Sequence, residues 1–209
     1  QYNHASRSAF DYYIRGVAID PLDYRCNLAL ATLEYNRADY PRAVEYATQA
    51  LARAHRLNKN PQCGQASFIR ASALERQQCF PEAKEDFWRA TWSGNSKAAG
   101  FYGLARLAAR ELHYPEGIEF CRQSLRACPT NQDVLCLQVR LLQLSGDAEE
   151  AKANLQTLRH DYPLNPTVWW LQWQSEGSDE ALNAWRDICG GRDINAQLTR
   201  SEEHTSDLQ

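Results

Sequence analysis

Small and apolar side chains recur along the chain with a spacing of 34 residues. Small residues stand at one phase of this period, at Ala83, Gly117 and Ala151. Apolar or thiol side chains follow them one helical turn later, at Phe87, Cys121 and Leu155. Residues that end helices follow after a further eight positions, at Asn95, Pro129 and Pro163. Spacings of three and four residues between apolar positions predict amphipathic helices, and a fixed period of this length predicts stacked helical repeats.

Short polar turns divide each period into two helices. These turns are Ala38–Pro41, Gln78–Pro81, Leu112–Pro115 and Ser145–Ala148. Three of them place a proline at the start of the following helix. Proline is favourable there because an N–H at the first helical position would have no acceptor within the helix. Each period is therefore expected to contain a helix, a turn and a second helix.

This arrangement resembles the tetratricopeptide-repeat (TPR) consensus. In that family small residues at repeat positions 8 and 20 let two antiparallel helices pack closely. Position 8 is occupied here by Ala31, Ala71, Ala105, Val139 and Trp173. Position 20 is occupied by Ala9, Ala43, Ala83, Gly117, Ala151 and Ala181. Trp173 departs from the pattern. The resemblance implies an all-α, TPR-type α-solenoid of antiparallel helix pairs, with about five to six repeats in a right-handed superhelix.

The period also predicts the domain organisation. Residues 1–199 are expected to form one helical repeat domain, with repeats at 1–23 (partial), 24–63, 64–97, 98–131, 132–165 and 166–190 (shortened). The 24–63 repeat is longer because of a polar, proline-containing loop around Asn58–Cys63. Residues 200–209 resemble the translation of a sequencing adapter and are expected to be a disordered artefact. The chain begins at Gln1 and contains no Met, so we expect an internal piece of a longer protein.

Composition narrows the class of partner. The chain has 209 residues with 23 basic and 26 acidic side chains, a net charge of −3, which gives no electrostatic reason to expect a nucleic acid or an anionic membrane. It has no apolar run long enough for a membrane span. Seven cysteines without a C-x-x-C pair are interpreted as reduced, buried thiols. We therefore expect a cytoplasmic protein, although an upstream signal could be missing.

Motifs for catalysis are absent from the sequence. The histidines are scattered without metal-ligand spacing, and the chain has no P-loop, G-x-S-x-G or G-x-G-x-x-G motif. We expect no enzyme activity in this fragment, no metal and no cofactor.

The resemblance implies where a ligand would bind. In TPR proteins the first helices of successive repeats line a concave groove. The corresponding candidate residues are Arg25, Tyr35, Phe68, Arg76, Tyr102, Arg106, Arg110, Arg140, Trp170 and Gln174, with Thr32, Ser72, Glu75 and Gln143 at further groove positions. Arg106, Arg110 and Arg140 are expected to cluster, and such a cluster suits a carboxylate or an acidic peptide. The alternative is that these arginines are solvated and pair with acidic neighbours. The Lys/Asn carboxylate clamp of chaperone-binding TPR proteins is absent.

Two functions follow from these observations. The first is a non-catalytic protein–protein interaction scaffold that binds a peptide or partner segment in the groove. The second rests on residues 90–105, which resemble a segment of large bacterial proteins that carry a mutarotase-like β domain before a TPR region. That resemblance implies an accessory repeat region of a carbohydrate-active enzyme, used for glycan contact or for docking to a missing N-terminal domain. Trp88, Trp92, Trp169, Trp170, Trp173 and Trp185 could hold sugars, but packing is the favoured interpretation.

Overall fold

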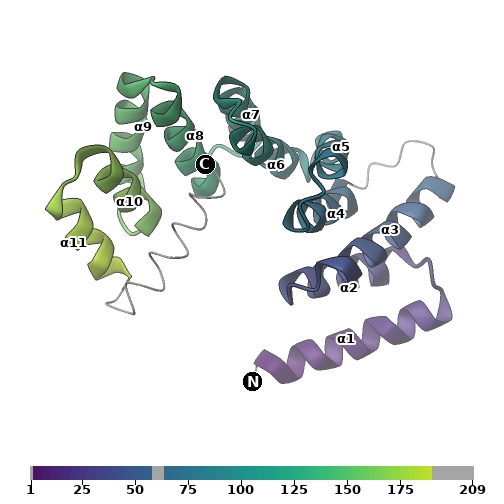
Figure 1. Cartoon of the computed structure of the whole chain (residues 1–209). Coiled ribbons are helices and arrows are strands. Elements are labelled where there is room, and N and C mark those ends of the chain that lie inside the picture. The colour runs from purple at the N-terminus through teal and green to yellow at the C-terminus, as the bar shows by residue number, and fades with distance from the viewer. Residues whose placement is uncertain (1, 58–63, 190–209) are drawn as a thin grey trace. The chain divides into compact units, whose positions relative to one another are not determined.

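The computed structural model describes residues 2–57 and 64–189, and these residues are α-helical apart from turns (Figure 1). Side chains are described from residue 9 onward, except those of residues 55 and 57. The helices are α1 (Tyr2–Ile19), α2 (Tyr24–Asn36), α3 (Tyr40–Leu57), α4 (Gly64–Arg76), α5 (Phe80–Ala90), α6 (Lys97–Arg110), α7 (Tyr114–Ala127), α8 (Gln132–Ser145), α9 (Ala148–Asp161), α10 (Pro166–Glu176) and α11 (Asp179–Ile188). The predicted all-α fold of consecutive helix pairs is confirmed.

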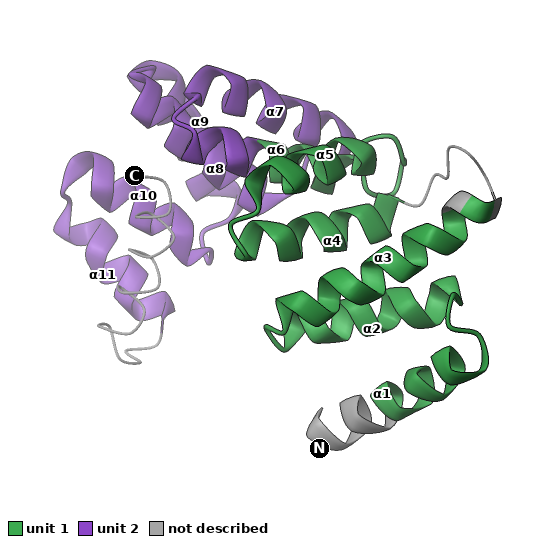
Figure 2. Ribbon diagram, turned by 45° about the vertical axis from the view of Figure 1, so that its right-hand side comes forward, with its two compact units in different colours: residues 1–104 green, residues 105–209 purple. Residues whose placement is uncertain are grey.

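The chain forms two compact units, residues 1–104 and 105–209, shown in green and purple in Figure 2. In unit 1 each helix from α1 to α5 contacts the next, and α2 also contacts α4. In unit 2, α7 contacts α8, α8 contacts α9, and α10 contacts α8, α9 and α11. Contacts between α2 and α4, and between α8 and α10, join the first helices of neighbouring pairs, as expected for stacked repeats.

The small residues lie in the core of each unit. Ala31, Ala43, Ala71, Ala83 and Ala105 have no exposed surface. A Cβ atom built on Gly117 would lie 2.9 Å from Cδ1 of Leu141 and 3.6 Å from Cβ of Ala108, so α7 approaches its neighbours closely. Close approach of helix backbones is the reason that small side chains recur at these positions.

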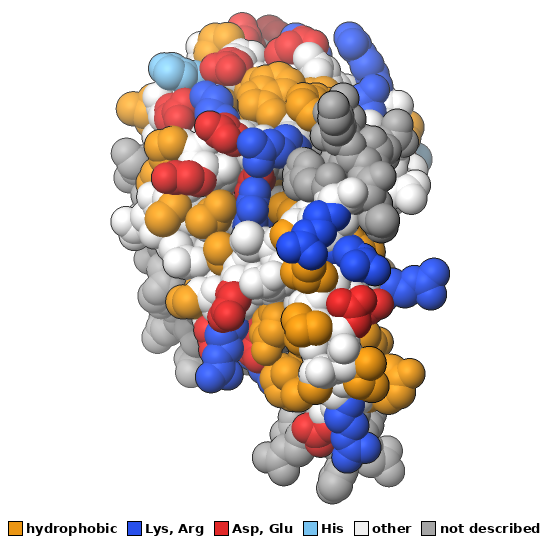
Figure 3. All heavy atoms as spheres, turned by 90° about the vertical axis from the view of Figure 1, so that its right-hand side faces the viewer, with side chains coloured by type: hydrophobic (Ala, Val, Ile, Leu, Met, Phe, Trp, Pro, Cys, Tyr) orange, Lys and Arg blue, Asp and Glu red, His pale blue; other side chains and the backbone are white. Residues whose placement is uncertain are grey.

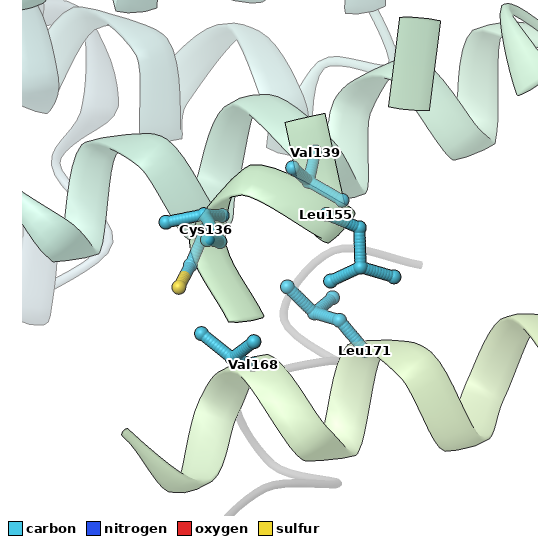
Figure 4. Packing of buried hydrophobic residues seen from close by; sticks show 6 residues of the cluster. Cys136, Val139, Leu155, Val168 and Leu171 are labelled. Atoms are coloured by element: carbon cyan, nitrogen blue, oxygen red, sulfur yellow. The ribbon is translucent and has the colours of Figure 1, made fainter. Parts of the chain in front are cut away.

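An aliphatic cluster forms the core of unit 2. It consists of Cys136, Val139, Leu155, Leu158, Val168 and Leu171. Figure 4 shows Cys136 of α8 facing Val168 of α10, with Val139, Leu155 and Leu171 gathered beside them. Burial of such side chains supplies most of the free energy that holds α8, α9 and α10 together.

The same hydrogen-bonded turn closes the first helix of four pairs. In the first of these turns the N–H of Asp39 donates to the carbonyl of Glu34, and the N–H of Ala38 donates to that of Tyr35. Equivalent bonds join Cys79 to Leu74 and Gln78 to Glu75, His113 to Ala108 and Leu112 to Ala109, and Asp147 to Leu142 and Gly146 to Gln143. This is a Schellman motif, which needs a residue with left-handed backbone geometry. The repeat is thus visible in the backbone hydrogen bonds.

Only one of these four turns has glycine at its left-handed residue. Gly146 has φ 90°, whereas Ala38, Gln78 and Leu112 have φ of 62°, 62° and 59°. A residue with a Cβ atom in this region costs about 1–2 kcal/mol. Three of the four turns therefore carry backbone strain that the period of the sequence does not reveal.

We expect the Gln78→Gly substitution to stabilise the chain by about 0.5–1 kcal/mol, because it removes this strain at the cost of some entropy in the unfolded chain. Gln78 is exposed, so little packing is lost. Urea unfolding followed by far-ultraviolet circular dichroism measures the effect. The matched control is Gly146→Ala, which should destabilise the chain by about 1 kcal/mol. Equal stabilities for Gln78→Gly and the wild type would contradict the assignment of strain.

The predicted repeat boundaries are not tested by the described residues alone. The pairs α2–α3, α4–α5, α8–α9 and α10–α11 fall inside the expected ranges, and α6 begins at Lys97, one residue before the expected 98–131 repeat. The loop around Asn58–Cys63 and the proposed artefact at 200–209 lie outside the described residues. The division into repeats therefore stays a prediction.

Candidate functional site

Tyr40 brings two of the predicted ligand-binding residues together in unit 1. The rings of Tyr35 and Tyr40 lie 5.6 Å apart. Arg76 places its guanidinium carbon 5.6 Å from the centre of the Tyr40 ring, and its Nε donates to the Tyr40 hydroxyl over 3.2 Å. Tyr35 and Arg76 thus belong to one aromatic–guanidinium cluster. Tyr40 begins the second helix of its pair and was not predicted, because nothing in the period distinguishes it from a helix-start residue.

The other candidates of unit 1 lie in different surroundings. Phe68 is half-buried and its ring lies 6.0 Å from that of the fully buried Phe87, so it contributes to packing. Arg25 is exposed near the start of α2, and Tyr102 is half-buried in α6. The role of Arg25 and Tyr102 stays a prediction.

In unit 2 the first helices α8 and α10 lie side by side in one direction. Asn165, which caps α10, donates to Oε1 of Gln132 at the start of α8 over 2.8 Å. Further along, Cys136 and Val139 of α8 meet Val168 and Leu171 of α10 in the core cluster. Residues of α10 therefore lie beside residues about 32 or 33 positions earlier in α8. We call the line of contact between these two helices the α8–α10 seam.

Four candidate positions lie within one helical turn of the seam residues in α8 and α10 and contain buried polar atoms without a hydrogen-bond partner. The atoms are Nε of Arg140, Oε1 of Gln143, Nε1 of Trp170 and Oε1 of Gln174. Arg140 follows Val139 and Trp170 precedes Leu171, two residues of the seam core. Gln143 and Gln174 lie one turn further along the same helix faces. Among the seven such atoms found in the described residues, these four form the largest group on adjacent helices.

Burial lowers the pKa of the Arg140 guanidinium, and the Coulombic influence of Tyr114 acts in the opposite direction. Burial therefore outweighs the favourable interaction with Tyr114 and disfavours the charged form of Arg140. A half-buried arginine normally has an acidic partner that offsets this cost. Gln172, on another face of α10, shows the usual outcome: it accepts from Arg159 over 3.2 Å and donates to Glu176 over 3.1 Å. The unpaired atoms are thus a property of the seam and not of α10 as a whole.

Arg106 is half-buried and Arg110 is exposed in α6, and Arg140 is half-buried in α8. Arg106 and Arg110 both have interactions with other groups. The predicted clustering of the three guanidinium groups is not tested and stays a prediction.

Most of the tryptophans pack against other rings or side chains. Trp170 lies 4.8 Å from Trp173 and 5.7 Å from Trp185, measured between ring centres. Trp169 donates from Nε1 to the carbonyl of Pro163 over 2.7 Å, and Arg159 lies over its ring. This aromatic cluster also explains Trp173, since its large ring is accommodated where other repeats have a small residue. The packing interpretation is wrong for Trp92, whose side chain is exposed.

Two of the described cysteines are buried thiols. Burial raises the pKa of both Cys121 and Cys136 to about 12, so these thiols stay protonated at neutral pH. Four other described cysteines are only half-buried, so the prediction that most are core residues is wrong for Cys26, Cys79, Cys128 and Cys189. Within the described ranges, no group of three or more His, Cys, Asp or Glu side chains is arranged to hold a metal ion.

The surface and the helix lengths add two observations. Figure 3 shows basic, acidic and apolar side chains interspersed on the face that it presents, without a broad patch of one charge.

None of the helices in the described part of the chain combines the length and the apolar character needed to cross a membrane.

Comparison with known proteins shows what this chain is similar to. A tetratricopeptide-repeat family model matches residues 28–95. A TPR protein from Parabacteroides merdae is similar with a TM-score of 0.71 and 13% identity, over 99% of this chain and 79% of that one. YrrB, described as a TPR protein with an unusual peptide-binding site, has a TM-score of 0.63 and 14% identity, over 90% and 97% of the two chains. Pseudomonas aeruginosa pilF has a TM-score of 0.67 and 16% identity, over 95% and 99%.

At these identities the solved structures show a shared fold alone. The family model adds the sequence signature over one part of the chain. The chain is accordingly a TPR-type helical-repeat array in its fold, with the sequence signature of the tetratricopeptide-repeat family at residues 28–95.

Proposed function

We propose that this chain is a non-catalytic interaction scaffold that binds an extended peptide segment of a partner along the first helices of its repeats. The observation that carries the proposal is the direct contact of first helices within each unit, α2 with α4 and α8 with α10. Neighbouring first helices bring polar and aromatic side chains close together at a regular spacing, which suits a peptide more than a small molecule.

Side chains on the first helices of each unit, taken separately, support the same function. Tyr35 and Arg76 with Tyr40 in unit 1, and Arg140 and Gln143 in unit 2, can donate and accept hydrogen bonds. Arginine and tyrosine are enriched at binding hot spots because they combine a large contact area with directional hydrogen bonds. YrrB, which is similar in fold, is described as having a peptide-binding site.

A pair of charge reversals on the first helices tests the proposal. Arg76 and Arg110 are both exposed and occupy the same position in successive repeats. Peptides are selected on the wild-type chain from a random linear dodecapeptide library, and their dissociation constants are measured by fluorescence polarisation. We expect the double variant Arg76→Glu/Arg110→Glu to bind the selected peptides at least about tenfold more weakly, a change of about 1.4 kcal/mol.

The matched control reverses two exposed arginines on second helices, Arg42 of α3 and Arg122 of α7. This Arg42→Glu/Arg122→Glu variant makes the same change in net charge, and we expect its affinities to stay within about twofold of the wild type. A library that yields no binding peptide, or two double variants with equal losses, would refute peptide binding by the first helices.

A further inference from the structure

The unpaired atoms at the α8–α10 seam have a specific hydrogen-bonding character. Two are donors, the N–H groups at Nε of Arg140 and Nε1 of Trp170, and two are acceptors, the amide oxygens of Gln143 and Gln174. Trp170 is 7% exposed, so its N–H is held among buried groups. Buried polar groups are nearly always paired in folded proteins, and a cluster of exceptions needs an explanation.

Flexible side chains dominate this cluster. Arg140, Gln143 and Gln174 are half-buried, so parts of each lie near the surface while one polar atom is buried. Rotation about their side-chain bonds can bring the unpaired atoms to a ligand without a change in α8 or α10. Because these atoms gain no hydrogen bond in the folded chain, a ligand that pairs with them has no existing bond to break.

The donor and acceptor set restricts the ligand. A simple inorganic anion can accept from Arg140 but offers no donor to the two glutamine oxygens. A peptide group offers both an N–H donor and a carbonyl acceptor. A neighbouring carboxylate would be the negatively charged partner of the Arg140 guanidinium. A glycan also offers donors and acceptors, but protein–sugar contacts commonly stack a sugar on an aromatic face, and the ring of Trp170 is packed against Trp173 and Trp185.

We propose that the α8–α10 seam is the anchor of the bound peptide and takes a carboxylate together with an adjacent peptide group. Arg140 donates to the carboxylate, and the unpaired amide oxygens of Gln143 and Gln174 accept from N–H groups of the adjacent peptide backbone. The carboxylate belongs either to an acidic side chain or to the C-terminus of the partner. This inference rests on the proposed function and adds the chemistry and the place of recognition.

Three pools of fluorescein-labelled nine-residue peptides with identical random flanks provide the probes. The first has a central Glu with both ends capped, the second has a central Gln with both ends capped, and the third has a central Gln with a free C-terminal carboxylate. We expect the wild-type chain to bind the first or the third pool at least about tenfold more tightly than the second. The pool that binds more tightly identifies the source of the carboxylate.

Substitutions at the seam separate binding from folding. Arg140→Gln should bind all three pools within about twofold of one another, because the charge that selects the carboxylate is gone. Gln143→Leu and Gln174→Leu should weaken binding of the preferred pool by about tenfold without lowering the melting temperature, since each replaces an unpaired buried amide by an apolar group of similar size. Arg122→Gln and Gln123→Leu on α7 are the matched controls and should leave the pool preference unchanged.

The outcomes distinguish this inference from the broader proposal. Binding of the three pools with equal affinity, or an unchanged preference in Arg140→Gln, would overturn the carboxylate anchor while peptide binding remains. A lower melting temperature for both leucine variants would assign the glutamines to folding and overturn their binding role. Failure of every pool, together with failure of the dodecapeptide library, would refute both proposals. Binding of maltohexaose that is lost in Arg140→Gln would assign the seam to glycans instead.

Discussion

Replacement of Asp86 by Asn is expected to lower the free energy of unfolding by about 3 kcal/mol. Asp86 lies on α5 and its side chain is only 2% exposed. Its two oxygens accept from Nε and Nη2 of Arg70 on α4, over 2.6 and 2.8 Å, and from Nη1 of Arg89 over 3.0 Å. The substitution leaves the guanidinium of Arg70, whose side chain is 19% exposed, without its counter-charge in a largely buried position.

The neighbouring Glu85 provides a matched control. Its side chain is 73% exposed and lies 3.5 Å from the same Arg89. Because exposed ion pairs contribute little, Glu85→Gln should change the free energy of unfolding by less than about 0.5 kcal/mol. Urea unfolding followed by circular dichroism measures the free energy of unfolding of both variants. The dependence of this free energy on urea concentration should have the same slope in both variants and the wild type. Similar stabilities for Asp86→Asn and Glu85→Gln would show that the buried network does not hold α4 and α5 together.

The period of small residues was sufficient to predict helix pairs and much of the core. Ala31, Ala71 and Ala83 are buried because closely spaced helix backbones leave room for little else, and this requirement recurs in every repeat. The Arg70–Asp86 pair has no such signature. Its partners are 16 residues apart on different helices, and the positions 34 residues later are occupied by Leu104 and Phe120, which cannot form such a pair. Sequence periodicity reveals what every repeat shares and misses what one repeat has alone.

The same limit applies to the candidate site. The resemblance to the TPR family implies that Arg140, Trp170 and Gln174 are groove positions on the first helices. It could not show that their polar atoms lack partners, since pairing depends on side-chain rotamers and on which groups the neighbouring helices supply. Tyr40 was missed for the same reason: its contacts with Tyr35 and Arg76 join two different repeats.

Replacement of Gly103 by Ala should destabilise the chain by about 2 kcal/mol, although alanine favours helix formation by about 1 kcal/mol over glycine. A Cβ atom built on Gly103 would overlap Cδ1 and Cε1 of the Phe87 ring and would lie 2.6 Å from its Cζ. Phe87 has no exposed surface, so its ring has no free space into which it can move. The steric cost therefore exceeds the gain in helix propensity. Thermal and urea unfolding measure the net effect.

A second substitution tests whether Phe87 is the cause. Phe87→Leu shortens the side chain that the new methyl group would meet, so the loss in Gly103→Ala/Phe87→Leu should be smaller than the sum of the two single losses by about 1 kcal/mol. Gly94→Ala is the control, because a Cβ atom there meets nothing within 4 Å, and its effect should stay below about 0.5 kcal/mol. Strict additivity in the double variant would exclude the Phe87 ring as the source of the strain. Coupling of the expected sign would show that the junction of α5 and α6 needs a glycine because a buried aromatic ring occupies the space of its missing side chain.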